Sequence, residues 1–146
     1  MSSDLADGFL ERASNKLTDS RSFSQSARYA EAVSAAQGSI ELSAKAVFLL
    51  LTPTHPRKHD FTEEEFLALL ASVLPTLNHY NFPRLYLLHR FWASFYTTAK
   101  YGLEVIGAPA KRLFEPPEAE LAQRHASAWT TAAVALRANL QAQATI

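Results

Sequence analysis

Apolar residues recur at steps of three and four along almost the whole chain, and this spacing constrains the fold more than any other feature. Only four glycines occur among the 146 residues, and the alternation of apolar and polar residues that marks strands is missing. A chain of this length has the usual size of one domain, and 48% of its residues are hydrophobic, enough for a substantial core. We therefore predict a single all-α domain, residues 1–146, folded as an up-and-down bundle of four to five helices.

The same spacing divides the chain into five predicted helices. Thr62 and Glu65 stand three residues apart ahead of an apolar run, as in a capping box that begins a helix. Prolines at 116 and 117 suit the first turn of the last helix, and Gly102 is a natural helix end. A Ser/Asp/Arg-rich stretch at 18–26 is predicted to connect the first two helices, so residues 1–22 hold the N-terminal helix and connection. In chain order, the predicted helices cover 4–17, about 25–51, 62–74, 83–102 and 116 or 117 to about 143.

The second predicted helix carries three different faces. Its apolar stripe predicts burial, and a flank of alanines and serines lets another helix approach closely. Gln37, Glu41 and Lys45 follow one another at four-residue steps along the other shoulder. Glu41 and Lys45 suit an intrahelical ion pair on the surface. Alternatively, the shoulder lines a cleft. The candidate ligand-binding residues are then Gln37, Glu41, Lys45 and Tyr101.

The fourth predicted helix is bulky and apolar on nearly every side. A helix of this kind needs apolar neighbours on two sides. We expect one side to pack inside its own bundle and the other to contact a second copy of the chain, which predicts a homodimer. The predicted interface consists of Leu88, Phe91, Trp92 and Phe95.

Composition narrows the classes of function. Acidic and basic residues number 14 each, which argues against the broad positive field of a dedicated nucleic-acid or anionic-membrane binder. The chain has no cysteine, so disulfides and thiolate-bound zinc are excluded. The longest uncharged apolar stretch, 46–51, is too short to span a bilayer, and residues 1–4 lack the basic character of a signal peptide. We predict a cytoplasmic protein with no membrane partner and no cofactor.

Several short motifs occur in a distinctive order. They are Tyr29 with Glu31 at the start of the long helix, Glu41 with Lys45 inside it, His59-Asp60 after a proline-rich break, and Tyr101-Gly102 with Glu104. Over roughly residues 29–133, this pattern resembles the HEPN domain family of small prokaryotic helical proteins. The resemblance implies a bundle of four to five helices, usually dimeric and often paired with a minimal nucleotidyltransferase. Members of the family include nucleotide- or nucleic-acid-binding modules and ribonuclease toxins.

The ribonuclease members carry an Arg-x(4–6)-His motif, and the segment RLYLLH, Arg84 to His89, matches it. In this alternative, the chain is a metal-independent ribonuclease toxin of a toxin–antitoxin pair, in which Arg84 binds the scissile phosphate and His89 serves as acid or base. The match is weak, because a pattern this short is met by chance about once in such a chain. A five-residue step also turns the two side chains about 140° apart on one helix, which hinders joint action within one protomer.

Histidines offer further candidates. Side chains of metal-binding type gather after the second helix at His55, His59, Asp60 and His79. A proline at 56 breaks the local geometry, so we predict no metal site and a capping or structural role for His59 and Asp60. His125 lies on the apolar side of the last helix and is predicted to make one structural hydrogen bond.

Basic and aromatic side chains are interleaved around the fourth helix. Such an arrangement can stack nucleobases and hold phosphates, although aromatics at helical spacing more often form a core or an interface. The basic residues are Arg84, Arg90, Lys100, Lys111 and Arg112, and the aromatic ones are Tyr86, Trp92, Tyr96 and Tyr101. The leading hypothesis is a non-enzymatic module that binds a nucleotide, RNA or a nucleotidyltransferase partner. A purely structural interaction domain is the third alternative.

Overall fold

The computed structural model describes residues 2–52 and 62–144, and most of them are helical. The α-helices are α1 (Ser2–Gln25), α2 (Tyr29–Leu51), α3 (Glu63–Leu70), α4 (Phe82–Ala93), α5 (Tyr96–Tyr101) and α6 (Pro116–Ala144), and the 3-10 helices are η1 (Pro75–Tyr80), η2 (Glu104–Ile106) and η3 (Ala110–Arg112). Within the described residues, extended pairing is limited to an isolated antiparallel bridge between Leu103 and Ala108. The predicted all-α class is confirmed.

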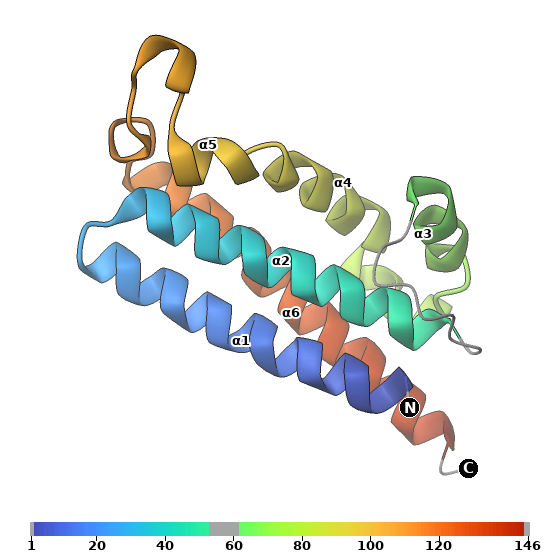
Figure 1. Cartoon of the computed structure of the whole chain (residues 1–146). Coiled ribbons are helices and arrows are strands. Elements are labelled where there is room, and N and C mark those ends of the chain that lie inside the picture. Colours follow the sequence, from blue (N-terminus) through green and yellow to red (C-terminus); the bar gives the residue numbers. More distant parts are fainter. Residues whose placement is uncertain (1, 53–61, 145–146) are drawn as a thin grey trace.

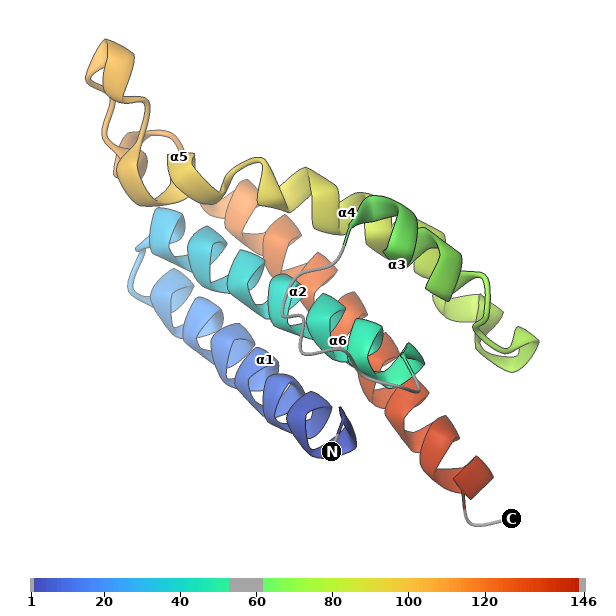
Figure 2. The ribbon, with the colours of Figure 1, turned by 45° about the vertical axis from the view of Figure 1, so that its right-hand side comes forward.

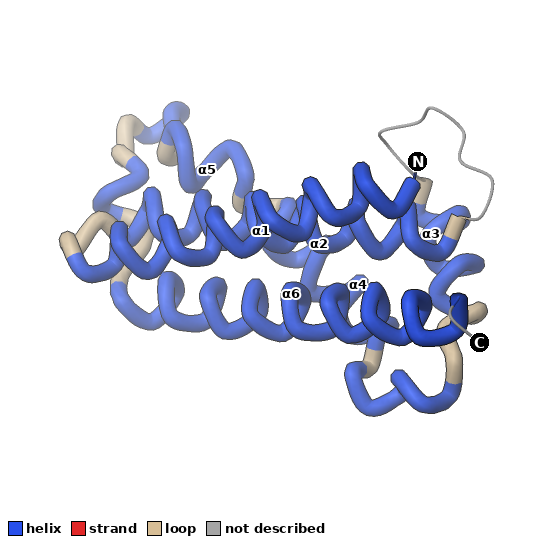
Figure 3. The backbone as a smooth tube through the Cα atoms, turned by 90° about the horizontal axis from the view of Figure 1, so that it is seen from below, coloured by secondary structure: helices blue, strands red, loops and turns tan. Residues whose placement is uncertain are grey.

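Three long helices form the body of the molecule. α1, α2 and α6 run side by side, and every pair among them is in contact (Figure 1). α4 and α5 follow one another along a line over α2 and α6, and α3 lies beside α4 (Figure 2). The described loops are confined to the ends of these helices (Figure 3). The predicted bundle is therefore confirmed, with α2 at its centre.

The core is built around the apolar stripe of α2. Ile40 and Val47 are fully buried, as are Phe66 of α3 and Trp129 of α6. The Phe66 ring meets the Tyr86 ring of α4 edge-on, with centroids 5.4 Å apart. Burial of each side chain of this size contributes about 1.5–3 kcal/mol to stability. Because the stripe faces this core, the polar shoulder of α2 lies at its edge, near α4 and α5.

Small residues allow α1 and α2 to pack closely. The Ser39 hydroxyl donates a hydrogen bond of 2.8 Å to the Ala13 carbonyl, and the Ser20 hydroxyl donates one of 2.6 Å to the Ala32 carbonyl. All four residues are completely buried. The predicted flank of alanines and serines on α2 is thus the face on which α1 packs.

α1 is longer than the sequence predicts. Residues 18–26 were expected to form a connection, but the helix continues to Gln25. Its polar side chains there are held by α6, because the Gln123 amide donates hydrogen bonds to the hydroxyls of Ser20 and Ser24 at 3.1 and 2.7 Å. Tertiary contacts have overridden a weak local preference, and a short turn suffices to reach α2.

α3 begins as predicted. The Thr62 hydroxyl accepts a 3.1 Å hydrogen bond from the Glu65 N–H, and the Glu65 carboxylate accepts one of 3.4 Å from the Thr62 N–H. The capping box is confirmed. The helix ends at Leu70, earlier than the predicted residue 74.

The predicted fourth helix, 83–102, is two helices in the structure. α4 ends at Ala93 and α5 begins at Tyr96. At the break, the Ser94 hydroxyl donates a 2.6 Å hydrogen bond to the Phe91 carbonyl and so competes with the helical backbone bonds. The apolar spacing continues across the break, which is why periodicity alone did not reveal it.

Gly102 ends α5, as predicted, with φ of 76°. A Cβ at this position would lie 2.2 Å from the carbonyl oxygen of Ala108, so the close approach needs glycine. The chain then makes a projecting turn that contains η2 (Figure 1). α6 starts at Pro116 and ends at Ala144, which confirms the predicted last helix.

Candidate functional site

The polar shoulder of α2 contacts α4 through Glu41. Its carboxylate Oε2 lies 2.9 Å from Nε2 of His89, whose side chain is 12% exposed. This hydrogen bond is the main reason why the pKa of Glu41 lies below its ordinary value; burial opposes it, and the charges of His89 and Lys45 add smaller effects. Among the ion pairs of the described residues, Glu41 is paired with His89 and not with Lys45. The intrahelical pair suggested by the spacing is replaced by a contact between helices.

Beside this contact, the surface is hollowed between α1, α2 and the junction of α4 with α5. One hollow has a volume of about 370 Å³ and a second has about 560 Å³. Lys16, Gln37, Gly38 and Tyr96 line both hollows. The two therefore adjoin, and we call the combined space the α1–α5 cleft.

The cleft is positively charged. Three exposed cations line it: Arg12, Lys16 and Lys100. No ion pair joins any of them to an acid in the part of the chain that the structure describes. The two lining acids already have partners, since Glu31 pairs with Arg28 and Glu41 with His89. The lining cations outnumber the lining acids, and Glu31 is offset by Arg28 outside the lining, so an anion that enters the cleft meets a net positive charge.

Gln37 lies where the two hollows meet. The residue is only 7% exposed, and its side-chain amide makes no hydrogen bond to another described protein group. A side-chain amide offers two donors and an acceptor oxygen. The polar atoms of this amide reach the open cleft, so water can satisfy them in the free protein. A ligand with a matching donor and acceptor can take the place of that water.

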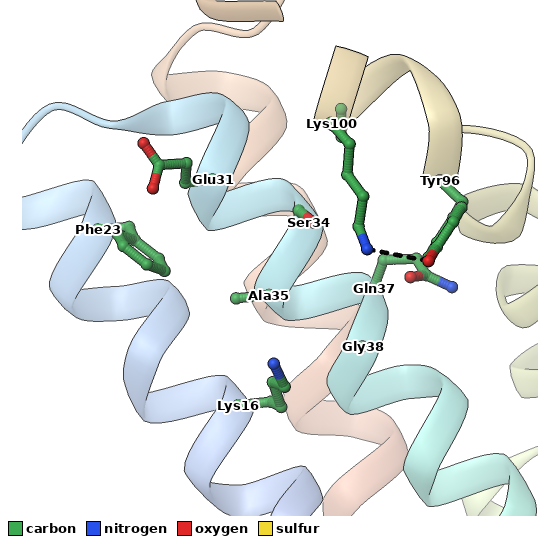
Figure 4. A pocket seen from close by; sticks show the side chains of 10 residues that line it. Lys16, Phe23, Glu31, Ser34, Ala35, Gln37, Gly38, Tyr96 and Lys100 are labelled. Atoms are coloured by element: carbon green, nitrogen blue, oxygen red, sulfur yellow. Dashed lines mark hydrogen bonds between the residues drawn. The ribbon is translucent and has the colours of Figure 1, made fainter.

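Two contacts shape the walls of the cleft (Figure 4). The Lys100 ammonium donates a 2.9 Å hydrogen bond to the Tyr96 hydroxyl and lies 4.2 Å from the centroid of that ring. The bond to Tyr96 holds the pKa of Lys100 above its ordinary value, so the ammonium stays charged. On the opposite wall, a Cβ added to Gly38 would lie 3.6 Å from Cδ of Lys16. The Lys16 stem therefore lies over bare backbone.

The structure brings together two of the four predicted ligand-binding residues. Gln37 and Glu41 line the cleft. Lys45 lies one turn beyond Glu41 and is not among the lining residues, and Tyr101 is 62% exposed at the end of α5. Sequence reasoning missed Arg12 and Lys16. They stand four residues apart on α1, and Gln37 and Glu41 stand four residues apart on α2. Because the two helices form a hairpin, a search for polar residues at this spacing on both helices would have found them.

The two residues of the ribonuclease motif have different neighbours. The His89 ring lies against the rings of Phe66, Tyr86 and Trp129, with centroids 6.5, 6.1 and 6.3 Å away. Arg84 is exposed in the first turn of α4, and its charge acts on His125 of α6. This geometry does not favour joint action of Arg84 and His89 within one chain.

The four residues of the predicted dimer interface differ in exposure. Leu88 and Trp92 are buried in the core of this chain, and Phe95 is half-buried. Phe91 is 47% exposed, and Leu87, one turn before it, is 65% exposed. The interface stays a prediction, and its accessible part is the Leu87–Phe91 face of α4.

Of the predicted metal-type side chains, His55, His59 and Asp60 lie outside the described residues. The His79 ring packs on the Tyr80 ring, with centroids 4.1 Å apart. Across residues 2–52 and 62–144, no three histidine or acidic side chains are grouped to hold a metal ion. No helix in the same ranges is long and apolar enough to cross a membrane.

The predicted role of His125 is confirmed. Its Nδ1 accepts a 2.9 Å hydrogen bond from the Trp92 indole.

Comparison with known proteins gave one family. The family model described as HEPN domain matches residues 6–120 of this chain. No curated protein and no solved structure matched significantly.

Proposed function

Because this chain belongs to the HEPN domain family, we propose that it is a non-enzymatic module whose α1–α5 cleft binds a nucleotide or a segment of RNA. The single observation that carries the proposal is Gln37, whose amide has no protein partner and opens onto the centre of a cationic cleft. A nucleobase edge presents a donor beside an acceptor, which is the pattern that a side-chain amide binds in a bidentate way.

The charges around Gln37 suit the phosphate of the same ligand. Arg12 and Lys16 lie on one wall and Lys100 on the other. Charge-assisted hydrogen bonds from such cations to phosphate are about twice as strong as neutral ones. Tyr96, which is 49% exposed, adds an aromatic ring of the kind on which bases stack. The overall charge balance of the chain does not oppose this, because the positive charge is local.

Calorimetric titration with a nucleoside triphosphate and with a short single-stranded RNA tests the proposal. Lys16→Gln and Gln37→Leu are each expected to weaken binding about tenfold, which corresponds to about 1.4 kcal/mol. Gln37→Leu should change the melting temperature little, since the Gln37 amide makes no hydrogen bond to another described protein group. Lys111→Gln, an exposed lysine outside the cleft, is the matched control. Failure of both ligands to bind, or an equal loss with Lys111→Gln, would refute the proposal.

We also propose that the chain forms a homodimer through the exposed face of α4. Leu87 and Phe91 stand one turn apart there, and both are substantially exposed. Exposed apolar side chains grouped in this way commonly mark an interface. The partner nucleotidyltransferase implied by the family remains a prediction, as do the cytoplasmic location and the alternative of a toxin. Co-purification of the two proteins from a joint expression would test the first.

A further inference from the structure

The larger hollow of the α1–α5 cleft, of about 560 Å³, contains a carboxylate that is held in place. Among the described residues that line this hollow, Glu41 is the one acid. Because an ionised carboxylate can only accept, the hydrogen in its 2.9 Å contact with His89 belongs to Nε2 of that ring. The ring is packed among three aromatic side chains, Phe66, Tyr86 and Trp129. His89 therefore fixes Oε2 of Glu41 and, with it, the orientation of the carboxylate.

The rest of the Glu41 carboxylate is open to a ligand. The side chain is 36% exposed where it lines the hollow. Arg12 and Lys16 line the same hollow, but neither forms an ion pair with Glu41 within the part of the chain that the structure describes. The hydrogen bond from His89 holds the pKa of Glu41 below its ordinary value, so the group is ionised at neutral pH. The hollow thus contains a fixed acceptor that cannot donate.

Gln37 stands one turn before Glu41 on α2, and both line the larger hollow. Side chains at this step have Cβ atoms about 5–6 Å apart, so one planar base can contact both. The Gln37 amide offers a donor beside an acceptor, and Glu41 adds a further acceptor next to them. Together they present three hydrogen-bonding positions in a row.

The Watson–Crick edges of the four RNA bases differ at the third of these positions. Every base has a donor beside an acceptor, so the Gln37 amide alone suits all four. In guanine, the O6 acceptor and the N1–H donor are followed by the N2 amino group, which is a second donor. Adenine has a C–H there, and cytosine and uracil have a carbonyl oxygen, which a carboxylate repels. Guanine is thus the base that gives Glu41 a hydrogen to accept.

We propose that the larger hollow selects guanine: Gln37 binds O6 and N1–H, and Glu41 accepts from the N2 amino group. This selectivity rests on the nucleotide- or RNA-binding function proposed above and names the base that the cleft takes. A base in the larger hollow leaves its phosphate near Lys16 and Lys100, which line the smaller hollow of about 370 Å³. The phosphate then lies away from the Glu41 carboxylate, which would repel it.

Calorimetric titration of the full chain with GTP, ITP, ATP, CTP and UTP tests the selectivity. The comparison with ITP is the sharpest, because its base differs from guanine only by the missing N2 amino group. The parent chain should bind GTP about tenfold more tightly than each of the other four. The same comparison in RNA uses short uridine strands that carry a single central guanosine, inosine or adenosine.

Glu41→Gln should abolish the preference for GTP over ITP. The Nε2–H of His89 then pairs with the amide oxygen and the amide N–H group faces the hollow, so a donor meets the N2 amino group. A thermal melt of the variant establishes that it is folded at the temperature of the titration. Glu31→Gln is the matched control and should keep the preference, because Glu31 lines the smaller hollow and is paired with Arg28.

The outcomes separate the selectivity from the function on which it rests. If neither the nucleotides nor the RNA strands bind, both are refuted. Equal affinities for GTP and ITP leave the binding function intact but overturn the selection of guanine. A preference for GTP that persists in Glu41→Gln also overturns it, because another residue then recognises the N2 amino group.

Discussion

Replacing Gly38 with alanine should stabilise the protein and weaken ligand binding. Gly38 lies in the middle of α2, where glycine costs about 1 kcal/mol relative to alanine. The added Cβ would lie 3.6, 3.8 and 3.9 Å from Cδ, Cε and Cγ of Lys16, which are ordinary van der Waals distances. No clash offsets the gain in helix propensity, so the free energy of unfolding should rise.

The expected gain is about 1 kcal/mol in the free energy of unfolding, which raises the melting temperature by about 2–4 °C in a chain of this size. Gly8→Ala is the matched control. Gly8 also lies inside a helix, and a Cβ there meets nothing within 4 Å, so it reports helix propensity alone. Gly8 is not among the residues that line the cleft.

Thermal unfolding and calorimetric titration with nucleotide or RNA measure the two effects. Both glycine variants should gain stability to a similar extent, but Gly38→Ala alone should lose affinity, since its methyl group takes up space at the floor of the cleft. A loss of stability in Gly38→Ala would show that the reasoning from contact distances is wrong. Equal affinities of the two variants would show that the ligand does not occupy this part of the cleft.

Three further changes test other parts of the structure. Glu41→Gln should lower the free energy of unfolding by about 1 kcal/mol at pH 7. The loss is this small because the Glu41 side chain is 36% exposed, so solvent screens its interaction with His89. Folding lowers the pKa of Glu41. The contribution of the ionised Glu41 to the free energy of unfolding is therefore complete above its ordinary pKa of 4.5 and is lost as the pH falls through its pKa in the folded protein. Denaturant melts of the parent chain and the variant should converge in acid. Gly102→Ala should be destabilising by more than about 1 kcal/mol, because φ is 76° and the Cβ would lie 2.2 Å from the Ala108 carbonyl oxygen; an unchanged melting temperature would contradict this. Phe91→Asp should convert a dimer to a monomer in light scattering with little change in stability, since the side chain is 47% exposed, and a parent chain that is already monomeric would remove the dimer proposal.

Much of the fold could be predicted from the sequence, because it rests on local signals. The capping box at Thr62 and Glu65 and the proline at 116 act through hydrogen bonds and φ angles of nearby residues, so their pattern is visible in the chain. The continuation of α1 beyond residue 17 depends instead on Gln123, about a hundred positions away. Such long-range support leaves no trace in a window of a few residues.

Half of the candidate site could be predicted from the sequence, because only that half gives a local signal. Gln37 and Glu41 stand out because they interrupt an apolar helix, and both line the cleft. Arg12 and Lys16 look like ordinary surface residues of α1 until the helix hairpin places them across from that line. The partner of Glu41 was predicted to be Lys45, four residues away, yet it is His89 on another helix. Spacing along one helix cannot rank a local partner against a tertiary one.

The strongest reason to regard the cleft as functional is that α2 departs there, in two consecutive positions, from the residues that best fill a buried helix face. Gln37 is an amide without a protein partner, and Gly38 is a glycine in a helix interior, which costs about 1 kcal/mol relative to alanine. The next residue shows that α2 can do otherwise, because the fully buried Ser39 hydroxyl is satisfied by the Ala13 carbonyl at 2.8 Å. Sequences are locally consistent where stability alone is selected, and departures concentrate at functional sites. The two departures fall together, at the point where both hollows meet, and a ligand bound there would explain both.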